Sequence, residues 1–239
     1  MPREASSPDE GHHRDVTGGS VRAAVFGVSD GLVSNLGLIL GVAGADPAPA
    51  VVRVAGLAGL VAGAVSMGAG EYNSVRVQNE LFERELELER IELRRNPAGE
   101  QEELAEVYEA RGVPGQRARE LAAAMMSDPD MALEVHAKEE LGMGPDSLAS
   151  PLAAASSSLV CFSVGALVPL APWFVGEGSA ATIASLVLAV VAAVVVGWAI
   201  AATAERPVPR VVARQLLFTL VPAAITYAVG SALGVSGVG

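Results

Sequence analysis

The chain has 239 residues, of which 51% are hydrophobic, yet its formal net charge is −11. A soluble domain seldom combines these two properties, and here they are segregated along the chain. Residues 80–146 hold 18 acidic and 8 basic side chains, so almost the whole net charge lies in one segment. This distribution indicates a membrane protein with an acidic insert, and the acidic insert disfavours nucleic-acid binding.

The chain offers little for covalent or cofactor chemistry. Its single cysteine, Cys161, lies in an apolar run, which excludes a disulfide within the chain and a metal site built from cysteines. The sequence contains no nucleophile–base pair, nucleotide-binding loop or cofactor motif. It therefore predicts neither an enzyme nor a prosthetic group.

The first 20 residues are polar and contain no apolar core, so they do not have the pattern of a signal peptide. We expect residues 1–20 to form a disordered cytoplasmic tail. The His12–His13 pair in this tail could contact a metal ion, but two histidines in such a segment more often have no specific role.

Five stretches are long and apolar enough to cross a bilayer, which takes about 20 mostly apolar residues. They cover approximately residues 21–45, 51–72, 151–175, 180–204 and 208–233. The sequence therefore predicts an all-α protein with transmembrane helices 1–2 over residues 21–72 and helices 3–5 over residues 147–239. A cytoplasmic helical domain is expected between them, over residues 73–146.

The distribution of arginines predicts the orientation of the spans. Arginines precede the first span, occur throughout the insert, and include Arg206, Arg210 and Arg214 between the fourth and fifth spans. The turn after the first span holds only Arg53, and the turn after the third holds none. Because positively charged loops stay in the cytoplasm, we expect the N-terminus and the insert to be cytoplasmic.

Glycines recur along the first two spans. In the first span they stand at Gly27, Gly31, Gly37, Gly41 and Gly44. Small residues four apart let helix backbones approach closely inside a membrane. The pattern leaves open whether these glycines pack within the chain or line a dimer seam.

The insert has a helical pattern that continues from the second span to Arg95. Three further helices are predicted at about residues 100–111, 116–126 and 130–141, because turns rich in Pro, Gly and Asn separate them. We expect a compact helical domain.

Asp30 lies inside the first predicted span. An ionisable side chain there is costly and is a candidate functional residue, although Asp30 could instead be a residue of the cytoplasmic helix end. A carboxyl group without a partner in such surroundings tends to keep its proton, and a cation can displace that proton. This behaviour suits an exchanger.

Met67, in the second span, is a second candidate. A thioether is a soft ligand that can contribute to a transition-metal site, although a methionine in an apolar span is usually a packing residue. Glycines flank Met67, and Glu71 follows one helical turn later.

The insert concentrates carboxylates at helical spacing. Glu85, Glu89 and Glu92 share one face of a helix, and Glu100 and Glu103 repeat the three-residue spacing. Like charges this close repel one another unless a cation or protons intervene, although most such runs are solvated faces. The last helix of the insert adds His136, Glu139 and Glu140. Carboxylates with imidazole suit Fe²⁺, Mn²⁺, Co²⁺ or Zn²⁺.

These residues resemble those of the vacuolar iron transporter family, which includes the plant and yeast vacuolar iron and manganese importers and bacterial relatives. The similar stretches are residues 26–35 (FGVSDGLVSN), residues 55–77 (AGLAGLVAGAVSMGAGEYNSVRV), the glutamate-rich insert, residues 139–142 (EELG) and residues 226–230 (TYAVG).

The resemblance implies a homodimer with five spans per chain that exchanges Fe²⁺ for protons. The aspartate and methionine that line the path in the family correspond to Asp30 and Met67. Its metal-gathering glutamates correspond to Glu89, Glu92, Glu100, Glu103 and Glu140. Plant-type members have two methionines where this chain has His136 and Ala137, so either His136 substitutes as a ligand or the site is weaker.

We therefore expect a membrane transporter that exports Fe²⁺, or Mn²⁺, from the cytoplasm in exchange for protons, with Co²⁺ and Zn²⁺ not distinguished. Asp30, Met67, Asn35 and Glu71 are the expected path residues. The alternative is a membrane-anchored metal sensor or store. Abundant Ala, Gly, Val and Arg with a single Lys favour a prokaryotic cell membrane, or the vacuolar membrane if the source is eukaryotic.

Overall fold

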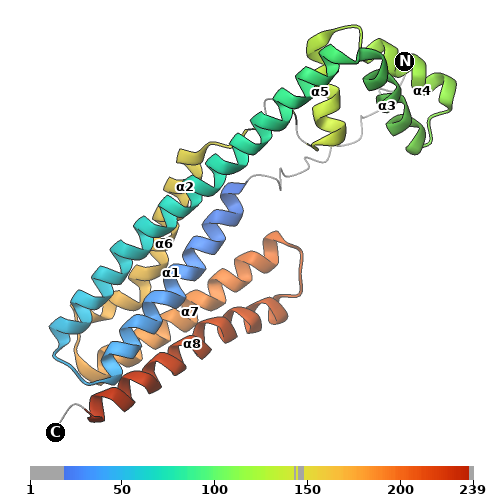
Figure 1. The fold of residues 1–239 in the computed structure, drawn as a ribbon. Helices are drawn as coiled ribbons and strands as arrows, with labels where there is room; N and C mark the ends of the chain where they lie inside the picture. The colour runs from blue at the N-terminus through green and yellow to red at the C-terminus, as the bar shows by residue number, and fades with distance from the viewer. Residues whose placement is uncertain (1–18, 143, 145–147, 237–239) are drawn as a thin grey trace, which may run out of the picture. The chain divides into compact units, whose positions relative to one another are not determined.

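The structure is a computed structural model that describes residues 19–142, 144 and 148–236 (Figure 1). Regular structure within these residues is entirely helical. Residues 1–18, which make up nearly all of the expected tail and include His12 and His13, lie outside the described residues.

Five helices are long and apolar enough to cross a membrane, as the sequence predicted. They are α1 (Gly19–Gly44), α2 (Pro49–Arg95), α6 (Pro151–Leu170), α7 (Gly178–Thr203) and α8 (Val208–Ser236). A 3₁₀ turn, η1 (Ala171–Phe174), extends α6. The predicted all-α class and the five candidate spans are thus confirmed.

The chain forms two compact units, and the boundary between them falls within α2. We call the first the membrane unit; it comprises the chain up to Ala69 and from Ala153 onward. We call the second, Gly70–Leu152, the helical insert.

Helix α1 lies at the centre of the membrane unit. Its Leu32, Leu36 and Leu40 pack against Ala189 and Ala193 of α7 and against α8. Its Ile39 packs in a second cluster with α2, with the end of α6 and with the buried Trp173 of η1. Leucines on α1 facing alanines on α7 give close interhelical packing, as is usual where helices associate in lipid.

The glycines of α1 pack within the chain. A Cβ atom at Gly31 would lie 2.1 Å from the backbone oxygen of Phe162 on α6, and one at Gly44 would lie 2.6 Å from the backbone oxygen of Tyr227 on α8. Gly230 of α8 meets α1 still more closely, since its Cβ would lie 1.8 Å from the Gly41 oxygen. The sequence left open whether the glycines of the first span pack within the chain or line a dimer seam. At Gly31, Gly41 and Gly44 the structure shows packing within the chain.

Two buried side chains bind the carbonyl groups at the end of α6. Asn35 of α1 donates through Nδ2 to the Ala166 oxygen at 2.7 Å, and Ser185 of α7 donates through Oγ to the Pro169 oxygen at 2.7 Å. Pro169 is among the last four residues of α6, whose carbonyl groups lack partners in their own helix, so the bond from Ser185 satisfies a group that lipid could not.

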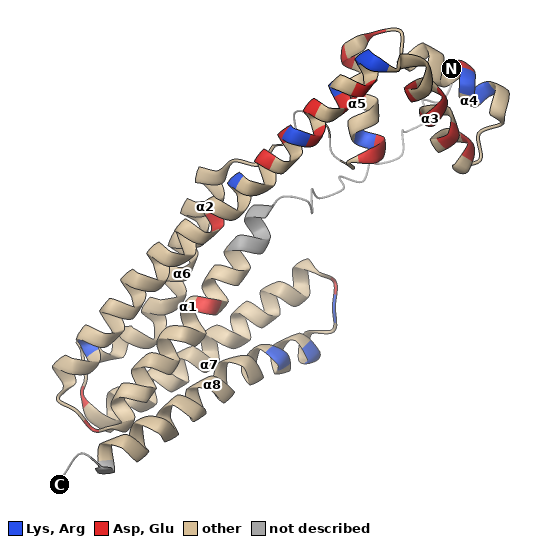
Figure 2. Cartoon of the chain, in the orientation of Figure 1, with Lys and Arg blue, Asp and Glu red and all other residues tan. Residues whose placement is uncertain are grey.

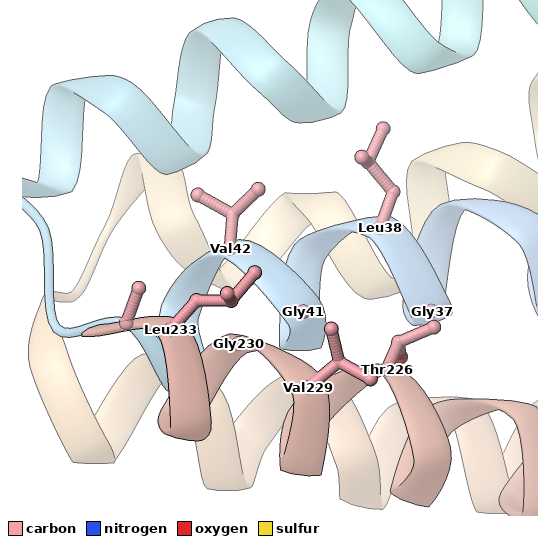
Figure 3. Close-up of a pocket in the computed structure, with 9 residues that line it drawn as sticks. Gly37, Leu38, Gly41, Val42, Thr226, Val229, Gly230 and Leu233 are labelled. Atoms are coloured by element: carbon pink, nitrogen blue, oxygen red, sulfur yellow. The ribbon is translucent and has the colours of Figure 1, made fainter. Parts of the chain in front are cut away.

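A groove of about 350 Å³ lies between α1 and α8 (Figure 3). Apart from Thr226, its lining consists of glycine, alanine and aliphatic side chains, among them Leu38, Val42, Val229 and Leu233. Because it contains no carboxylate, imidazole or sulfur ligand, this groove is not a candidate metal site.

The helical insert consists of the C-terminal half of α2 with α3 (Pro97–Ala110), α4 (Gly115–Met125) and α5 (Pro129–Glu140). Phe82 and Leu86 of α2 pack against Leu133 and Ala137 of α5. A second cluster joins α3 to α4 through Leu104, Ala105, Ala118 and Ala122. The predicted helices agree with these bounds to within three residues.

The close contact at Gly230 yields a prediction for stability. Gly230→Ala forces a methyl group against the α1 backbone, and overpacking of this kind costs about 1–3 kcal/mol. We expect a lower melting temperature in detergent micelles, measured by thermal unfolding of the full chain. The matched control is Gly70→Ala, because nothing lies within 4 Å of a Cβ added there. Equal destabilisation by the two variants would contradict the proposed packing.

Candidate metal centre

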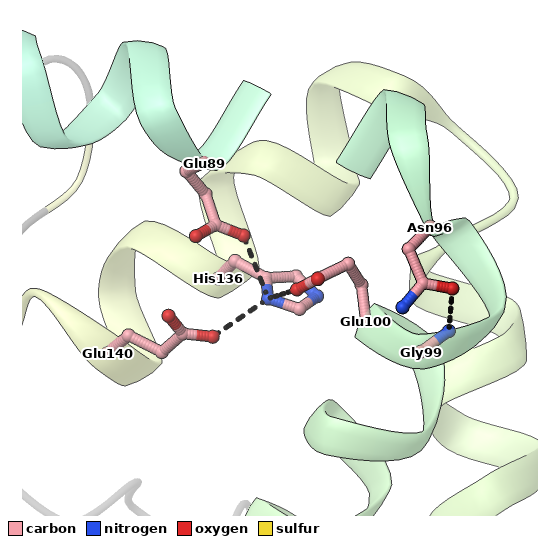
Figure 4. A network of polar contacts seen from close by, with 6 residues as sticks. All are labelled: Glu89, Asn96, Gly99, Glu100, His136 and Glu140. Atoms are coloured by element: carbon pink, nitrogen blue, oxygen red, sulfur yellow. Dashed lines mark hydrogen bonds and ion pairs between the residues drawn. The ribbon is translucent and has the colours of Figure 1, made fainter. Parts of the chain in front are cut away.

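Four residues from three helices of the insert converge on one point. They are Glu89 of α2, Glu100 of α3, and His136 and Glu140 of α5 (Figure 4). Each offers one ligating atom, and these atoms all lie within 4.8 Å of one another. We call these four residues the Glu–His cluster.

The local structure of each helix explains this convergence. His136 and Glu140 are four residues apart on α5, so they lie on the same face of that helix. The chain reverses between Arg95, the last residue of α2, and Pro97, the first of α3. Asn96 caps α3, with its Oδ1 accepting a hydrogen bond from the Gly99 N–H at 3.2 Å. This cap and the proline that follows start α3 at once, which places Glu100 in its first turn.

The imidazole of His136 lies at the centre of the cluster. Its Nδ1 is 3.0 Å from Glu140 Oε1, 3.2 Å from Glu89 Oε1 and 4.0 Å from Glu100 Oε2. The His136 side chain is fully buried, those of Glu89 and Glu100 are 7% and 11% exposed, and that of Glu140 is 31% exposed. Glu140 is thus the member of the cluster most accessible to solvent.

The cluster carries more negative charge than its own donors can offset. A single ring nitrogen faces three carboxylates and can donate at most one proton. No described residue donates a hydrogen bond to Glu89 Oε1, and the buried Nε2 of His136 likewise has no hydrogen-bond partner among the described residues. Buried polar atoms are normally paired, so these atoms point to a missing partner.

The carboxyl groups respond to this environment. Burial raises the pKa of Glu89 from 4.5 to about 7; the Glu140 carboxylate adds to the rise and His136 opposes it. Burial also raises the pKa of Glu100, and the nearby Glu103 carboxylate acts in the same direction. Near neutral pH the cluster therefore holds either a proton or a cation.

The spacing of the ligating atoms suits one divalent ion. Ligands about 2.1 Å from one ion, at tetrahedral to octahedral angles, lie about 3.0–3.4 Å from each other. The two shorter distances from His136 Nδ1 are already in this range, and small side-chain movements bring Glu100 into it. One imidazole with three carboxylates is a ligand set for Fe²⁺, Mn²⁺, Co²⁺ or Zn²⁺.

The sequence analysis named six residues as metal ligands, and the structure brings four of them together. Glu92 and Glu103 are exposed and lie outside the cluster. Their charges nevertheless raise the pKa values of Glu89 and Glu100. Glu139 forms an ion pair with Arg111 and is not part of the cluster.

Met67 and the residue that follows Asp30 both lie against Phe162 of α6. Gly31, next to Asp30, packs on the Phe162 backbone. Met67 of α2 packs against the cluster formed by Ala64, Phe162 and Ala166. Asp30 is half-buried, and its backbone oxygen accepts a hydrogen bond from Ser34 Oγ at 2.5 Å.

The other two expected path residues differ in their surroundings. Asn35 is 2% exposed and donates a hydrogen bond to the Ala166 oxygen, so this side chain joins α1 to α6. Its Oδ1 has no hydrogen-bond partner among the described residues. Glu71 is half-buried on the part of α2 that belongs to the insert.

Sequence reasoning did not identify Asn96 as the residue that positions Glu100. It treated residues 96–99 as a turn that ends one helix, whereas the structure starts α3 at Pro97. The signal was present, because Asn followed by Pro is a cap and first-position pair that commonly opens a helix.

Comparison with known proteins gives consistent matches along the chain. A model of the VIT family matches residues 21–231. A vacuolar iron transporter of Acanthamoeba castellanii is 42% identical over 154 residues, which are 64% of this chain and 55% of the amoeba protein. The match thus spans little more than half of that relative.

Two plant proteins are similar over a larger share of both chains. Vacuolar iron transporter 1 of Eucalyptus grandis is 33% identical over 180 residues, covering 75% of this chain and 72% of the plant protein. Vacuolar iron transporter 2 of Oryza sativa is 33% identical over 192 residues, covering 80% and 78%. With a match over most of its length and five candidate membrane-spanning helices, this chain belongs to the VIT family.

Proposed function

We propose that this protein is a membrane transporter that exports a divalent transition metal, Fe²⁺ foremost and Mn²⁺ second, from the cytoplasm in exchange for protons. The observation that carries the proposal is the Glu–His cluster, in which three carboxylates, two of them almost completely buried, face one imidazole nitrogen. The names of the similar proteins support iron as the cargo.

The insert is proposed to capture the metal. Glu140 is the exposed member of the cluster, and a metal ion entering beside it reaches the Nδ1 of His136 and then the buried Glu89 and Glu100. The insert is strongly acidic, and so raises the local concentration of divalent cations.

The membrane unit is proposed to carry the metal across. Asp30 offers a carboxylate that binds either a metal ion or a proton, and Met67 offers a thioether. Protons that bind Asp30 on the return step would couple export to the pH gradient. The proposal includes a homodimer, cytoplasmic placement of the N-terminus and insert, and location in the cell membrane or, in a eukaryote, the vacuolar membrane.

Removing a buried carboxylate of the cluster is expected to have two opposite effects. Glu89→Gln weakens Co²⁺ or anaerobic Fe²⁺ binding at least tenfold, since loss of even an outer partner of a metal site costs 10–100-fold. It also raises the melting temperature of the metal-free protein at pH 8, because it relieves repulsion among buried carboxylates. The melting temperature without metal measures the change in stability, and its rise on adding metal measures the change in metal affinity.

Glu106→Gln is the matched control, because Glu106 is an exposed glutamate on α3 outside the cluster. It should leave both readings unchanged. Wild-type metal affinity in Glu89→Gln would refute a metal site at the cluster.

Metal affinity should depend on pH through Glu89. Its pKa of about 7 in the folded protein exceeds its ordinary 4.5, so the stability that it contributes without metal is complete below pH 4.5 and is lost as pH rises through 7. Metal must displace this proton, so affinity rises about tenfold per pH unit below 7 and levels off above it. Calorimetric titration from pH 5.5 to 8.5 measures the slope, and a slope that persists in Glu89→Gln would assign the proton elsewhere.

Transport is tested by Fe²⁺ flux into proteoliposomes under an imposed pH gradient. Asp30→Asn should abolish gradient-dependent uptake, whereas a Glu89→Gln/Glu100→Gln variant should raise the KM and retain most of the maximal rate. Asp46→Asn, in the turn after α1, is the control for loss of an aspartate. Binding without uptake in the wild type would instead favour a metal store, and full uptake by Asp30→Asn would exclude Asp30 as the coupling residue.

A further inference from the structure

Three arginines gather at one end of the membrane unit. Arg206 lies in the loop between α7 and α8, and Arg210 and Arg214 lie in the first two turns of α8; all three are exposed. The blue positions in this loop and at the start of α8 stand out in Figure 2. None of the ion pairs formed between described residues uses these side chains. We call them the arginine patch.

The arginines of α8 continue its lipid-facing stripe. Residues spaced by three and four share one face of a helix, and from Arg210 and Arg214 this face runs on to Phe218, Val221 and Ile225. These three apolar side chains are 58%, 46% and 59% exposed. In a membrane, exposed side chains of this kind contact acyl chains, so Arg210 and Arg214 project toward lipid.

The opposite face of α8 is buried against the rest of the unit. Val211, Gln215, Thr219 and Ala223 are each less than 9% exposed. Arg210 and Arg214 therefore do not line a cavity between helices within the described chain. Their guanidinium groups are available only to what surrounds the membrane unit at this level.

The level corresponds to the membrane interface. A Cβ atom added to Gly197 of α7 would lie 3.0 Å from Val212 Cα of α8, so Trp198, one residue closer to the loop between these helices, lies at about the depth of Val211, next to Arg210. Trp198 is 58% exposed, and exposed tryptophans collect at headgroup depth. The 29 residues of α8 span about 43 Å, which exceeds the roughly 30 Å of a hydrocarbon core, so there is length for turns of α8 to lie at headgroup depth.

We propose that the arginine patch binds the headgroups of anionic phospholipids. Residues 80–146 hold 18 acidic and 8 basic side chains, whose net negative charge an anionic bilayer surface repels, whereas the patch presents three positive charges beside the single acid Glu205. A guanidinium group donates paired hydrogen bonds to phosphate oxygens. The adjoining Phe218, Val221 and Ile225 contact the acyl chain of the same lipid, so headgroup and tail are bound by one helix face.

This role differs from that of a signal for orientation. Arginines that only direct insertion act while the chain enters the membrane and need not bind lipid in the folded protein. A lipid site, in contrast, discriminates between headgroups after folding, and its affinity falls as salt rises.

The test uses the purified full-length protein in mixed micelles with phosphatidylglycerol or phosphatidylcholine of the same acyl chains. Bound lipid is counted by native mass spectrometry, and the melting temperature is followed in parallel. The wild type should retain phosphatidylglycerol in preference to phosphatidylcholine, with the preference falling as salt rises. Arg210→Gln/Arg214→Gln should lose about 25-fold in affinity, at about fivefold per arginine.

Two further variants separate charge from structure. Arg210→Lys/Arg214→Lys keeps the charges but loses the paired hydrogen bonds, so its affinity for phosphatidylglycerol should lie between those of the wild type and the glutamine variant. Arg84→Gln/Arg117→Gln removes the same charge from exposed positions of the insert and should bind phosphatidylglycerol as the wild type does. Equal retention of the two lipids by the wild type, or a preference insensitive to salt, would overturn the proposal without reference to any variant. Unchanged binding in Arg210→Gln/Arg214→Gln would overturn it as well.

Discussion

The insert is organised around the contact of one imidazole nitrogen with three carboxylates. Nδ1 of His136 lies within 4.0 Å of oxygens from Glu89, Glu100 and Glu140, and three of these four side chains are almost completely buried. Such a group of charges is unstable unless a cation or protons join it. The apolar packing of α2 against α5 and of α3 against α4 provides the stability that holds the carboxylates together. The fold of the insert thus maintains a site whose charges favour binding of a cation.

The membrane unit depends on a different constraint, which is close contact between helix backbones. Glycine at Gly41 and Gly230 lets α1 and α8 touch, and glycine at Gly31 and Gly165 does the same for α1 and α6. Contacts this close leave no room for a side chain and little for a sliding motion between these helices. Any conformational change that exposes Asp30 to alternate sides of a membrane must therefore occur mainly elsewhere, or by movement of α1, α6 and α8 together.

Much of this structure could be predicted from the sequence because its patterns are strong and local. Long apolar runs predict the five spans, and the turns rich in Pro and Gly predict where the helices of the insert begin and end. The sequence pointed to Glu89, Glu100, His136 and Glu140 as candidate ligands, but it could not show that these four converge while Glu92 and Glu103 lie outside the cluster. All of these glutamates have similar spacing, and which of them converge depends on the angle at which α3 leaves α2. The Asn96 cap is a local feature that fixes where α3 begins, but the angle between two helices is a tertiary property that helical periodicity does not encode.

If the Glu–His cluster binds metal as proposed, His136 bears both on which metal is preferred and on how binding responds to protons. Three carboxylates alone would also suit Mg²⁺ and Ca²⁺, which are abundant, whereas one imidazole favours first-row transition metals. The same histidine lies beside Glu89, whose pKa near 7 places proton release in the physiological range. Metal and proton thus compete for the same atoms near neutral pH. In the proposed transporter, the affinity of the insert for metal would therefore be highest at neutral or alkaline pH and would fall as the pH drops through 7, so cytoplasmic pH would set how far the insert is loaded.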